Sequence, residues 1–497
     1  MDRKRKMTAR RWLFRLASVF CGLSLFAAFE LFCRAADWGR AETVQDPFVE
    51  FTSIRPLFEL TAEGRTYHTS PARRGFFREV SFAAKKPPGE FRVFVFGGST
   101  VQGNPFSIET SFPTYLQIAL EHADPDHSWK VVNCGGVSYA SYRLLPVLQE
   151  CQSYQPDLFL FCEGHNEFLE DVSFADVRQT STVVQKGYSL LSKLRSFRLL
   201  QRTVHGPSPV LASAAVPAPD SRKPLLSGEV DTLLDHDGGL DAYHRDDQHA
   251  ETVHQHFRSN LQRMIDLCQS QAVPLLLILP PSNLSDCPPF KSEYSAATTE
   301  DDRTRIRSLL KKAREVSLRD VRQAICIVQQ VTAIDPRYAF SWYELGQQQL
   351  SVGDNVAADA SFRRARDEDV CPLRITTPLE TALLETAETN YVPLINAHEL
   401  LRSRCAQGII GENVLVDHVH PSFRGHEDIA MAIADWMLAA GFVTEAKPDW
   451  QAATQLECRT QLQSLDDLYF LRGRRALENL KLWAAGRSGG PPLKLRK

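Results

Sequence analysis

The stretch FRVFVFGGST, residues 91–100, joins a run typical of a β-strand to a glycine turn. Residues 91–96 are aromatic or β-branched over strand length, apart from one arginine, and two glycines and Ser99 follow at once. Farther on, residues 111–122 carry apolar side chains at helical spacing. A strand, a glycine turn and a helix are typical of a parallel α/β sheet, whose sites form at the carboxyl ends of strands. Taken alone, such a turn more often reflects backbone conformation than chemistry.

Two further apolar runs end in polar or glycine-rich loops. Residues 129–133 (WKVVN) precede Cys134-Gly135-Gly136, and residues 157–162 (DLFLFC) run into the loop EGHNE at 163–167. These are three predicted strands whose carboxyl ends carry Ser, Gly and Asn, so the case for a site at this edge of the sheet is stronger.

A short turn late in the chain supplies an acid and a base. Asp417 stands three residues before His420, ahead of a predicted helix at 425–438. This spacing lets the carboxylate hold the Nδ1–H of His420 while Nε2 faces a nucleophile. The same offset makes His418 a neighbour of the turn rather than the base. His165, beside Asn166, is a further candidate to touch substrate.

The order of these blocks resembles that of the SGNH (GDSL-type) hydrolase family. The matching positions are Ser99 in its glycine turn, Gly135, Gly164-x-Asn166 and Asp417-x-x-His420. The resemblance implies a three-layer α/β/α sandwich around a central parallel sheet. It also implies a nucleophile, a general base and an orienting carboxylate, namely Ser99, His420 and Asp417. The implied oxyanion donors are the N–H of Ser99, the N–H of Gly135 and the side-chain amide of Asn166.

The chain departs from the family pattern at several points. Gly-Gly-Ser-Thr replaces Gly-Asp-Ser-Leu, and Glu167 stands where the family has aspartate. Either Gly135 or Gly136 could donate to the oxyanion. The 318 positions between Ser99 and Asp417 exceed what a minimal core needs, so insertions are expected.

The N-terminus combines a basic leader with an apolar run. Six lysines and arginines lie between positions 3 and 11, and residues 12–33 are mostly apolar. These 22 residues are long enough to cross about 30 Å of hydrocarbon, and the basic flank predicts a cytoplasmic N-terminus. We therefore expect a single-pass transmembrane helix with the catalytic domain extracytoplasmic. A cleaved signal peptide and a buried soluble helix are the alternatives.

The composition and residue pattern of the remaining chain predict a hydrolase domain that is interrupted by an insert. The predicted divisions are 1–35 leader and anchor, 36–85 juxtamembrane segment, 86–295 first part of the hydrolase with a proline-rich linker at 204–226, 296–372 helical insert, 373–445 last part of the hydrolase, and 446–497 helical extension.

The insert carries one and a half copies of a pattern that resembles the tetratricopeptide repeat. Its matching residues are Trp342, Leu345, Gly346, Ala358, Phe362 and Ala365. A hairpin packed on the hydrolase and a surface for a protein partner are both open. Tyr343 and Gln347, on other faces of the first predicted helix, would distinguish them, and we expect the insert to dock near the site mouth.

Composition excludes several classes of protein. Of 497 residues 43% are hydrophobic and 24% charged, and the net charge of −3 gives no reason to expect nucleic-acid binding. The eleven cysteines form no CxxC pair, and the histidines and aspartates at 235–256 match no compact ligand set. We therefore expect no metal and no cofactor.

The sequence thus predicts an extracytoplasmic serine esterase acting on an acyl or acetyl ester, with a small-molecule or carbohydrate ester as substrate. One alternative uses the same residues as an O-acyltransferase that moves acetyl groups to or from a cell-envelope polysaccharide. Another is a tetratricopeptide-type interaction protein with an inactive hydrolase domain.

Overall fold

A computed structural model describes residues 2–36, 38, 50–51, 55–170, 194–196, 199, 225–226, 229–236 and 238–484. The chain divides into two compact units, residues 1–45 with 178–222 and residues 46–177 with 223–497. The predicted linker at 204–226 lies outside the described residues except for the short strand β8 (Leu225–Leu226), which pairs with β1 (Glu50–Phe51).

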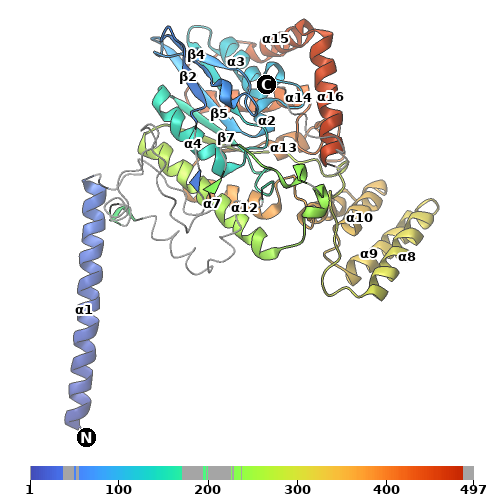
Figure 1. The fold of residues 1–497 in the computed structure, drawn as a ribbon, viewed down its shortest axis with the longest axis horizontal. Coiled ribbons are helices and arrows are strands. Elements are labelled where there is room, and N and C mark those ends of the chain that lie inside the picture. The colour runs from blue at the N-terminus through green and yellow to red at the C-terminus, as the bar shows by residue number, and fades with distance from the viewer. Residues whose placement is uncertain are drawn as a thin grey trace. The chain divides into compact units, whose positions relative to one another are not determined.

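A five-stranded parallel sheet forms the centre of the larger unit (Figure 1). Its order is β10-β9-β7-β5-β6, with all neighbouring pairs parallel. The strands are β5 (Glu90–Gly97), β6 (Ser128–Gly135), β7 (Leu158–Cys162), β9 (Leu275–Leu279) and β10 (Leu394–Asn396). The predicted central parallel sheet is confirmed, and all the strands end at one edge.

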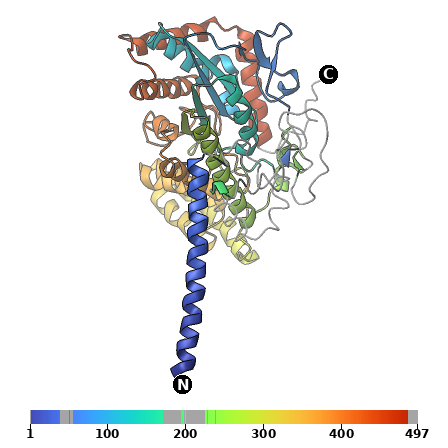
Figure 2. The ribbon, with the colours of Figure 1, turned by 90° about the vertical axis from the view of Figure 1, so that its left-hand side faces the viewer.

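Both faces of the sheet are covered by helices. Along β5, Val93 and Val95 enter one core cluster, while Phe94 and Phe96 point to the other face, as the two-residue period of a strand requires. The first face packs on α3 (Phe112–Ala123), α13 (Ala397–Arg402), α14 (Phe423–Ala439) and α15 (Trp450–Ser464). The second is covered by α4 (Ser141–Cys151), α7 (Asp247–Ser270) and α12 (Thr377–Thr389), so the larger unit has three layers (Figures 1 and 2).

A small antiparallel sheet occupies part of the predicted juxtamembrane segment. Its strands are β2 (Phe58–Leu60), β3 (Thr66–Thr69) and β4 (Ser81–Ala83). Phe82 lies edge-on to Phe94 of the central sheet at 5.6 Å between ring centroids. Described residues of this segment are therefore packed against the central sheet.

Short 3₁₀-helices connect these elements: η1 (Pro71–Arg73), η2 (Ile108–Thr110), η3 (Gln152–Tyr154), η6 (Leu233–Asp235) and η7 (Gly239–Ala242).

The insert is helical, as predicted, and it contains two antiparallel pairs. These are α8 (Glu300–Ser317) with α9 (Val321–Ile334), and α10 (Ala339–Ser351) with α11 (Asn355–Asp367). Gly346 faces the ring of Phe362, with no room for a Cβ between them, which explains the small residue at this position. The sequence pattern showed only half of the first pair. Membership of the tetratricopeptide class stays a prediction.

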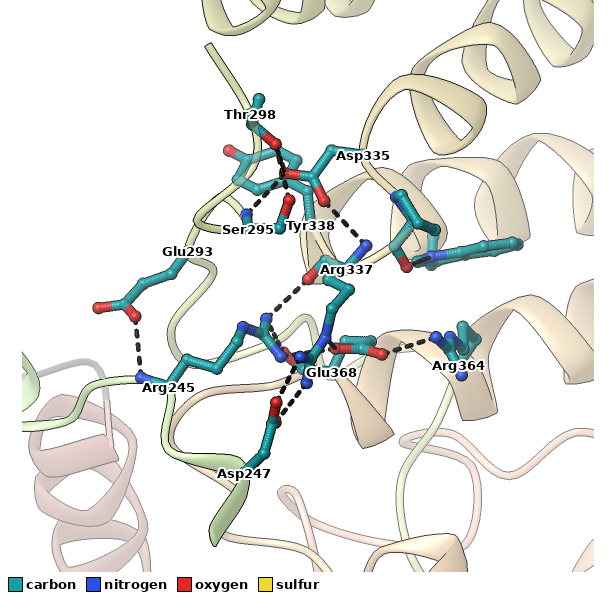
Figure 3. Close-up of polar contacts among 12 residues, drawn as sticks. Arg245, Asp247, Glu293, Ser295, Thr298, Asp335, Arg337, Tyr338, Arg364 and Glu368 are labelled. Carbon is teal, nitrogen blue, oxygen red and sulfur yellow. Dashed lines mark hydrogen bonds and ion pairs between the residues drawn. The ribbon is translucent and has the colours of Figure 1, made fainter. Parts of the chain in front are cut away.

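The second pair is bonded to the loop that follows β9 of the central sheet. Tyr343 Oη and Gln347 Nε2 both donate to the carbonyl of Ser285, at 2.8 and 2.5 Å, in the loop that follows β9. An ionic network reinforces the junction (Figure 3): Arg245 and Arg337 share the carboxylate of Glu368 at the end of α11. Figure 1 shows the α8–α9 pair farther from the sheet.

The predicted C-terminal extension contains α15 and α16 (Asp467–Ala484), and α16 packs across loops of the larger unit (Figure 1). Gly473 leaves no room for a Cβ against Phe106. Tyr469 Oη hydrogen-bonds Thr110 at 2.7 Å, and Phe470 lies edge-on to Phe423. The helix therefore touches segments that follow both the Ser99 turn and the His420 turn.

The N-terminal helix α1 (Asp2–Ala35) covers the leader and the predicted membrane anchor at 12–33. Among the residues that the structure describes, no helix has both the length and the apolarity needed to cross a bilayer, so the predicted anchor is not confirmed. Glu30 interrupts the apolar run, and its carboxylate accepts hydrogen bonds from the backbone N–H groups of Arg195 and Ser196, at 3.0 and 2.9 Å, within the smaller unit.

Candidate active site

Ser99 stands just beyond the carboxyl end of strand β5, which lies between β7 and β6, and it begins the short helix α2 (Ser99–Gln102). Two glycines precede it because the backbone approaches its neighbours closely. A Cβ on Gly97 would collide with the carbonyl of Cys162, and one on Gly98 would collide with the side chains of Glu163 and Asn166. The Ser99 side chain is partly exposed at the edge of the sheet.

Ser99, His420 and Asp417 form a continuous chain of hydrogen bonds. His420 Nδ1 lies 2.7 Å from Asp417 Oδ2, and His420 Nε2 lies 2.7 Å from Ser99 Oγ. Since a carboxylate only accepts, the proton is on Nδ1, which leaves Nε2 to accept from the serine hydroxyl. The arrangement can activate Ser99 as a nucleophile.

The carboxylate of Asp417 is fixed by its own turn. Its Oδ1 accepts hydrogen bonds from the backbone N–H groups of Val419 and His420, at 2.9 and 2.8 Å. Burial raises the pKa of Asp417, but the nearby imidazoles of His420 and His418 and these hydrogen bonds outweigh it and hold that pKa well below its usual range. Asp417 is therefore ionised and able to orient and stabilise a charged His420.

The other two histidines near the turn have different roles. His418 Nδ1 lies 3.7 Å from Asp417 Oδ1, its ring packs against Phe290, and burial lowers its pKa to about 4. His165 is buried and accepts the N–H of Ile375 on Nδ1 at 3.0 Å, and burial lowers its pKa well below the usual value. Both are neutral, and neither occupies the place of His420 beside Ser99.

The predicted oxyanion donors differ in availability. Asn166 Nδ2 donates to the carbonyl of Tyr139 at 3.0 Å, which leaves its second N–H, next to Gly98, free for a ligand. The N–H of Gly135 instead donates to Asn133 Oδ1 at 2.9 Å, and that of Gly136 donates to the carbonyl of Gly97 at 2.9 Å. In this conformation both glycine N–H groups are already engaged.

Gly135 has a packing role that is independent of donation. A Cβ at this position would collide with the backbone nitrogen of Gln102 in α2. Gln102 in turn donates through Nε2 to the carbonyls of Phe76 and Gly135, at 2.6 and 3.1 Å. The glycine thus lets α2, and with it Ser99, lie directly on the end of β6.

The structure adds two residues to which the sequence reasoning assigned no role of their own. Asn283, in the loop after β9, donates through Nδ2 to the carbonyl of Asp417 at 3.0 Å, and its N–H donates to the carbonyl of His418. Glu163, at the end of β7, has its carboxylate against Gly98. Their only sequence signal is their place just after an apolar strand. Among the described residues no group of three or more His, Cys, Asp or Glu side chains is arranged to hold a metal ion.

No protein-family model and no curated protein matches the chain. Solved structures similar to it include a putative lipolytic protein of the G-D-S-L family from Desulfitobacterium hafniense DCB-2, at 11% identity over 69% of this chain and 98% of that one, with a TM-score of 0.29. A lipase/acylhydrolase from Enterococcus faecalis is 12% identical over 72% and 98%, with a TM-score of 0.30. Axe2, an acetylxylan esterase from Geobacillus stearothermophilus, is 11% identical over 69% and 93%, with a TM-score of 0.27. These scores are too low to transfer an activity to this chain.

Proposed function

We propose that the protein is an SGNH-type serine esterase that hydrolyses an acyl or acetyl ester. The observation that carries this proposal is the pair of 2.7 Å hydrogen bonds that joins Ser99 to His420 and His420 to Asp417. This is the order of contacts that a nucleophile, a general base and its orienting carboxylate need.

The proposed reaction begins when Ser99 Oγ attacks the ester carbonyl and His420 Nε2 takes the hydroxyl proton. Asp417 stabilises the imidazolium that forms. The developing oxyanion would accept hydrogen bonds from the Ser99 N–H and from the second N–H of Asn166 Nδ2. His420 then gives its proton to the departing alcohol, and water resolves the acyl-enzyme by the same steps.

The test of this proposal is covalent labelling with a fluorophosphonate probe, together with hydrolysis of short and long p-nitrophenyl esters. Wild-type protein should be labelled and active, whereas Ser99→Ala should lose both labelling and turnover while its circular dichroism is unchanged. Ser153→Ala is the matched control, since this serine is exposed and its hydroxyl donates to the carbonyl of Glu150. Labelling of the Ser99→Ala variant at the wild-type level would assign the nucleophile elsewhere.

Adding sugar acceptors to the same assay separates hydrolysis from transfer. A hydrolase releases free acid at a rate that the acceptor does not change. Acyl transfer would instead yield an acylated sugar and less free acid.

The extracytoplasmic location is a further part of the proposal. It is supported by the basic residues between positions 3 and 11 and the apolar run that follows them. A C-terminal fusion to a phosphatase that folds only outside the cytoplasm should be active. An inactive fusion, with an active cytoplasmic reporter at the same junction, would contradict this location.

We propose that the insert is a repeat-type helical hairpin that packs on the rest of the larger unit, rather than a groove that binds a protein partner. The support is the docking of Tyr343 and Gln347 on Ser285 and the repeat-like contact of Gly346 with Phe362. Release of a co-purifying protein by α10 surface variants, with unchanged stability, would favour a partner-binding surface instead.

A further inference from the structure

Glu163 is a buried glutamate directly after β7, and its carboxylate gathers the loop that carries Asn166. One oxygen, Oε1, accepts hydrogen bonds from three successive backbone N–H groups, those of Gly164, His165 and Asn166, at 3.0, 3.1 and 3.2 Å. The side chain is 2% exposed. This loop is thus curled around a single carboxylate oxygen.

The same carboxylate also reaches the turn that carries Ser99. The N–H of Gly98 hydrogen-bonds it, and a Cβ on Gly98 would lie 2.6 Å from Glu163 Oε2. Glycine at position 98 therefore permits a contact between the two loops that no other residue would allow. Four backbone N–H groups, one before the nucleophile and three leading to Asn166, share one side chain.

Ionising a carboxyl group in this buried position costs free energy. Burial raises the pKa of Glu163 to about 7, although the four backbone hydrogen bonds lower it. Hydrogen bonds from backbone N–H groups offset part of this cost, and they also hold those backbone groups in place.

We propose that Glu163 is a positioning residue of the oxyanion site, whose carboxylate ties the Gly98–Ser99 backbone to the Gly164–Asn166 loop. The proposal rests on the function proposed above. The two donors that the mechanism uses, the N–H of Ser99 and the amide of Asn166, come from two different loops. Glu163 fixes the distance between these loops, so both donors can meet the same ester oxygen.

Glu167, four residues farther on, offers a matched control. It too is a buried glutamate whose pKa is raised to about 7 by burial, with the charge of Glu163 contributing. Its carboxylate accepts from the N–H and hydroxyl of Ser141, both at 2.8 Å, at the start of α4. It anchors the far side of the same loop and makes no such contact with the nucleophile turn.

The experiment compares Glu163→Gln with Glu167→Gln in p-nitrophenyl ester hydrolysis. The glutamine amide must present an NH₂ group to N–H donors on one side or the other, which opens the contact between the loops. Glu163→Gln should lower kcat by about 10²-fold, the usual consequence of a displacement near 1 Å, with KM within about threefold. Glu167→Gln should change kcat by no more than about threefold.

A double-mutant cycle with Asn166→Ala tests whether Glu163 acts through that donor. If it does, Glu163→Gln should cost far less kcat in the Asn166→Ala background than in wild type, whereas general loosening of the fold would give additive losses. Glu163→Asp, which keeps the charge but shortens the reach, replaces the glutamine variant if that does not fold.

Equal kcat for Glu163 and Glu167 variants, or additive losses in the cycle, would overturn the positioning role while Ser99→Ala is still inactive. Turnover that survives in Ser99→Ala would instead overturn the proposed function itself.

Discussion

The turn that carries the proposed nucleophile, residues 97–102 (the nucleophile turn), and the turn that carries the proposed base and its carboxylate, residues 417–420 (the acid–base turn), are held in different ways. The nucleophile turn is fixed by close backbone approaches to β6 and β7 and by Glu163. The acid–base turn is fixed by the loop after β9, through Asn283, and that loop is itself bonded to α10 at Ser285. The first turn thus depends on the sheet and on the loop that follows β7, and the second depends in part on the inserted helices.

The largest effect is expected at the acid–base turn, from Asp417→Asn. The asparagine cannot hold the Nδ1–H tautomer of His420 as a carboxylate does, so kcat should fall by about 10⁴-fold, as assayed with a p-nitrophenyl ester. His418→Gln, one residue away, should leave kcat within about tenfold. A larger loss for His418→Gln than for Asp417→Asn would show that the wrong histidine is assigned as base.

On the nucleophile side, Asn166→Ala should lower kcat by about 10²–10³-fold with little change in KM, because one oxyanion donor is lost. Steady-state kinetics on a short ester measure both constants. A rise in KM at constant kcat would make Asn166 a residue for ground-state substrate binding.

A third prediction concerns α3 and α14, the helices that follow the two turns. His426, in α14, accepts the N–H of Phe112 in α3 on Nδ1 at 3.2 Å, and burial lowers its pKa to about 3, with the charge of His420 contributing. Below the unfolded-state value near 6.5 the unfolded chain binds a proton that the folded chain does not, so stability falls as the pH drops from about 6.5 towards 3.

Replacing His426 by Gln should therefore reduce the slope of the free energy of unfolding against pH in this range by up to about 1.4 kcal/mol per pH unit. Urea unfolding of both proteins between pH 4.5 and 7.5 measures the difference, in which the contributions of Glu163 and Glu167 cancel. Parallel curves would mean that His426 is protonated in the folded state.

A smaller effect is expected at Asn283, which links the loop after β9 to the acid–base turn. Asn283→Ala removes the donor to the Asp417 carbonyl and should destabilise the fold by about 1–3 kcal/mol and lower kcat by about tenfold. Asn390→Ala, which removes a side-chain amide bonded to the carbonyl of Thr386 and to Gln262, is the control and should affect stability without kcat. An unchanged kcat for Asn283→Ala would limit that residue to a structural role.

The smallest effect is expected where α10 of the insert bonds to Ser285. Tyr343→Phe removes one hydrogen bond to Ser285 while Gln347 keeps the other. Stability should fall by about 0.5–1.5 kcal/mol in urea unfolding, with kcat unchanged. If kcat fell as much as in Asn283→Ala, the insert would be coupled to catalysis more tightly than these contacts imply.

Sequence patterns were sufficient where local periodicity decides structure. The apolar runs at β5, β6 and β7 and the spacing of Asp417 and His420 have local causes, and so they predicted the sheet and the residues now found together. Residues 296–372 were predicted to be helical, but the repeat pattern did not mark α8, because this helix buries only Ile306, Leu310 and Ala313 among dense charge.

Contacts between distant segments left no such pattern. The short strands β2–β4 are held by rings such as Phe82 against Phe94. Asn283 is 134 positions from the carbonyl that it binds, and Glu163 bonds backbone N–H groups, which every non-proline residue carries. No residue type or spacing marks such partners in advance.

The insertion of α8–α11 between β9 and β10 also delays the completion of the proposed site during synthesis. Ser99 and His420 are 321 positions apart, so Ser99 leaves the ribosome roughly 15 to 60 s before His420, at ordinary translation rates. During this interval β6, β7, β9 and finally β10 emerge in turn, and throughout it Ser99 has no His420 beside it. On the proposed mechanism a growing chain therefore holds an inert serine, which can be activated only after the helical insert and the turn beyond it have emerged.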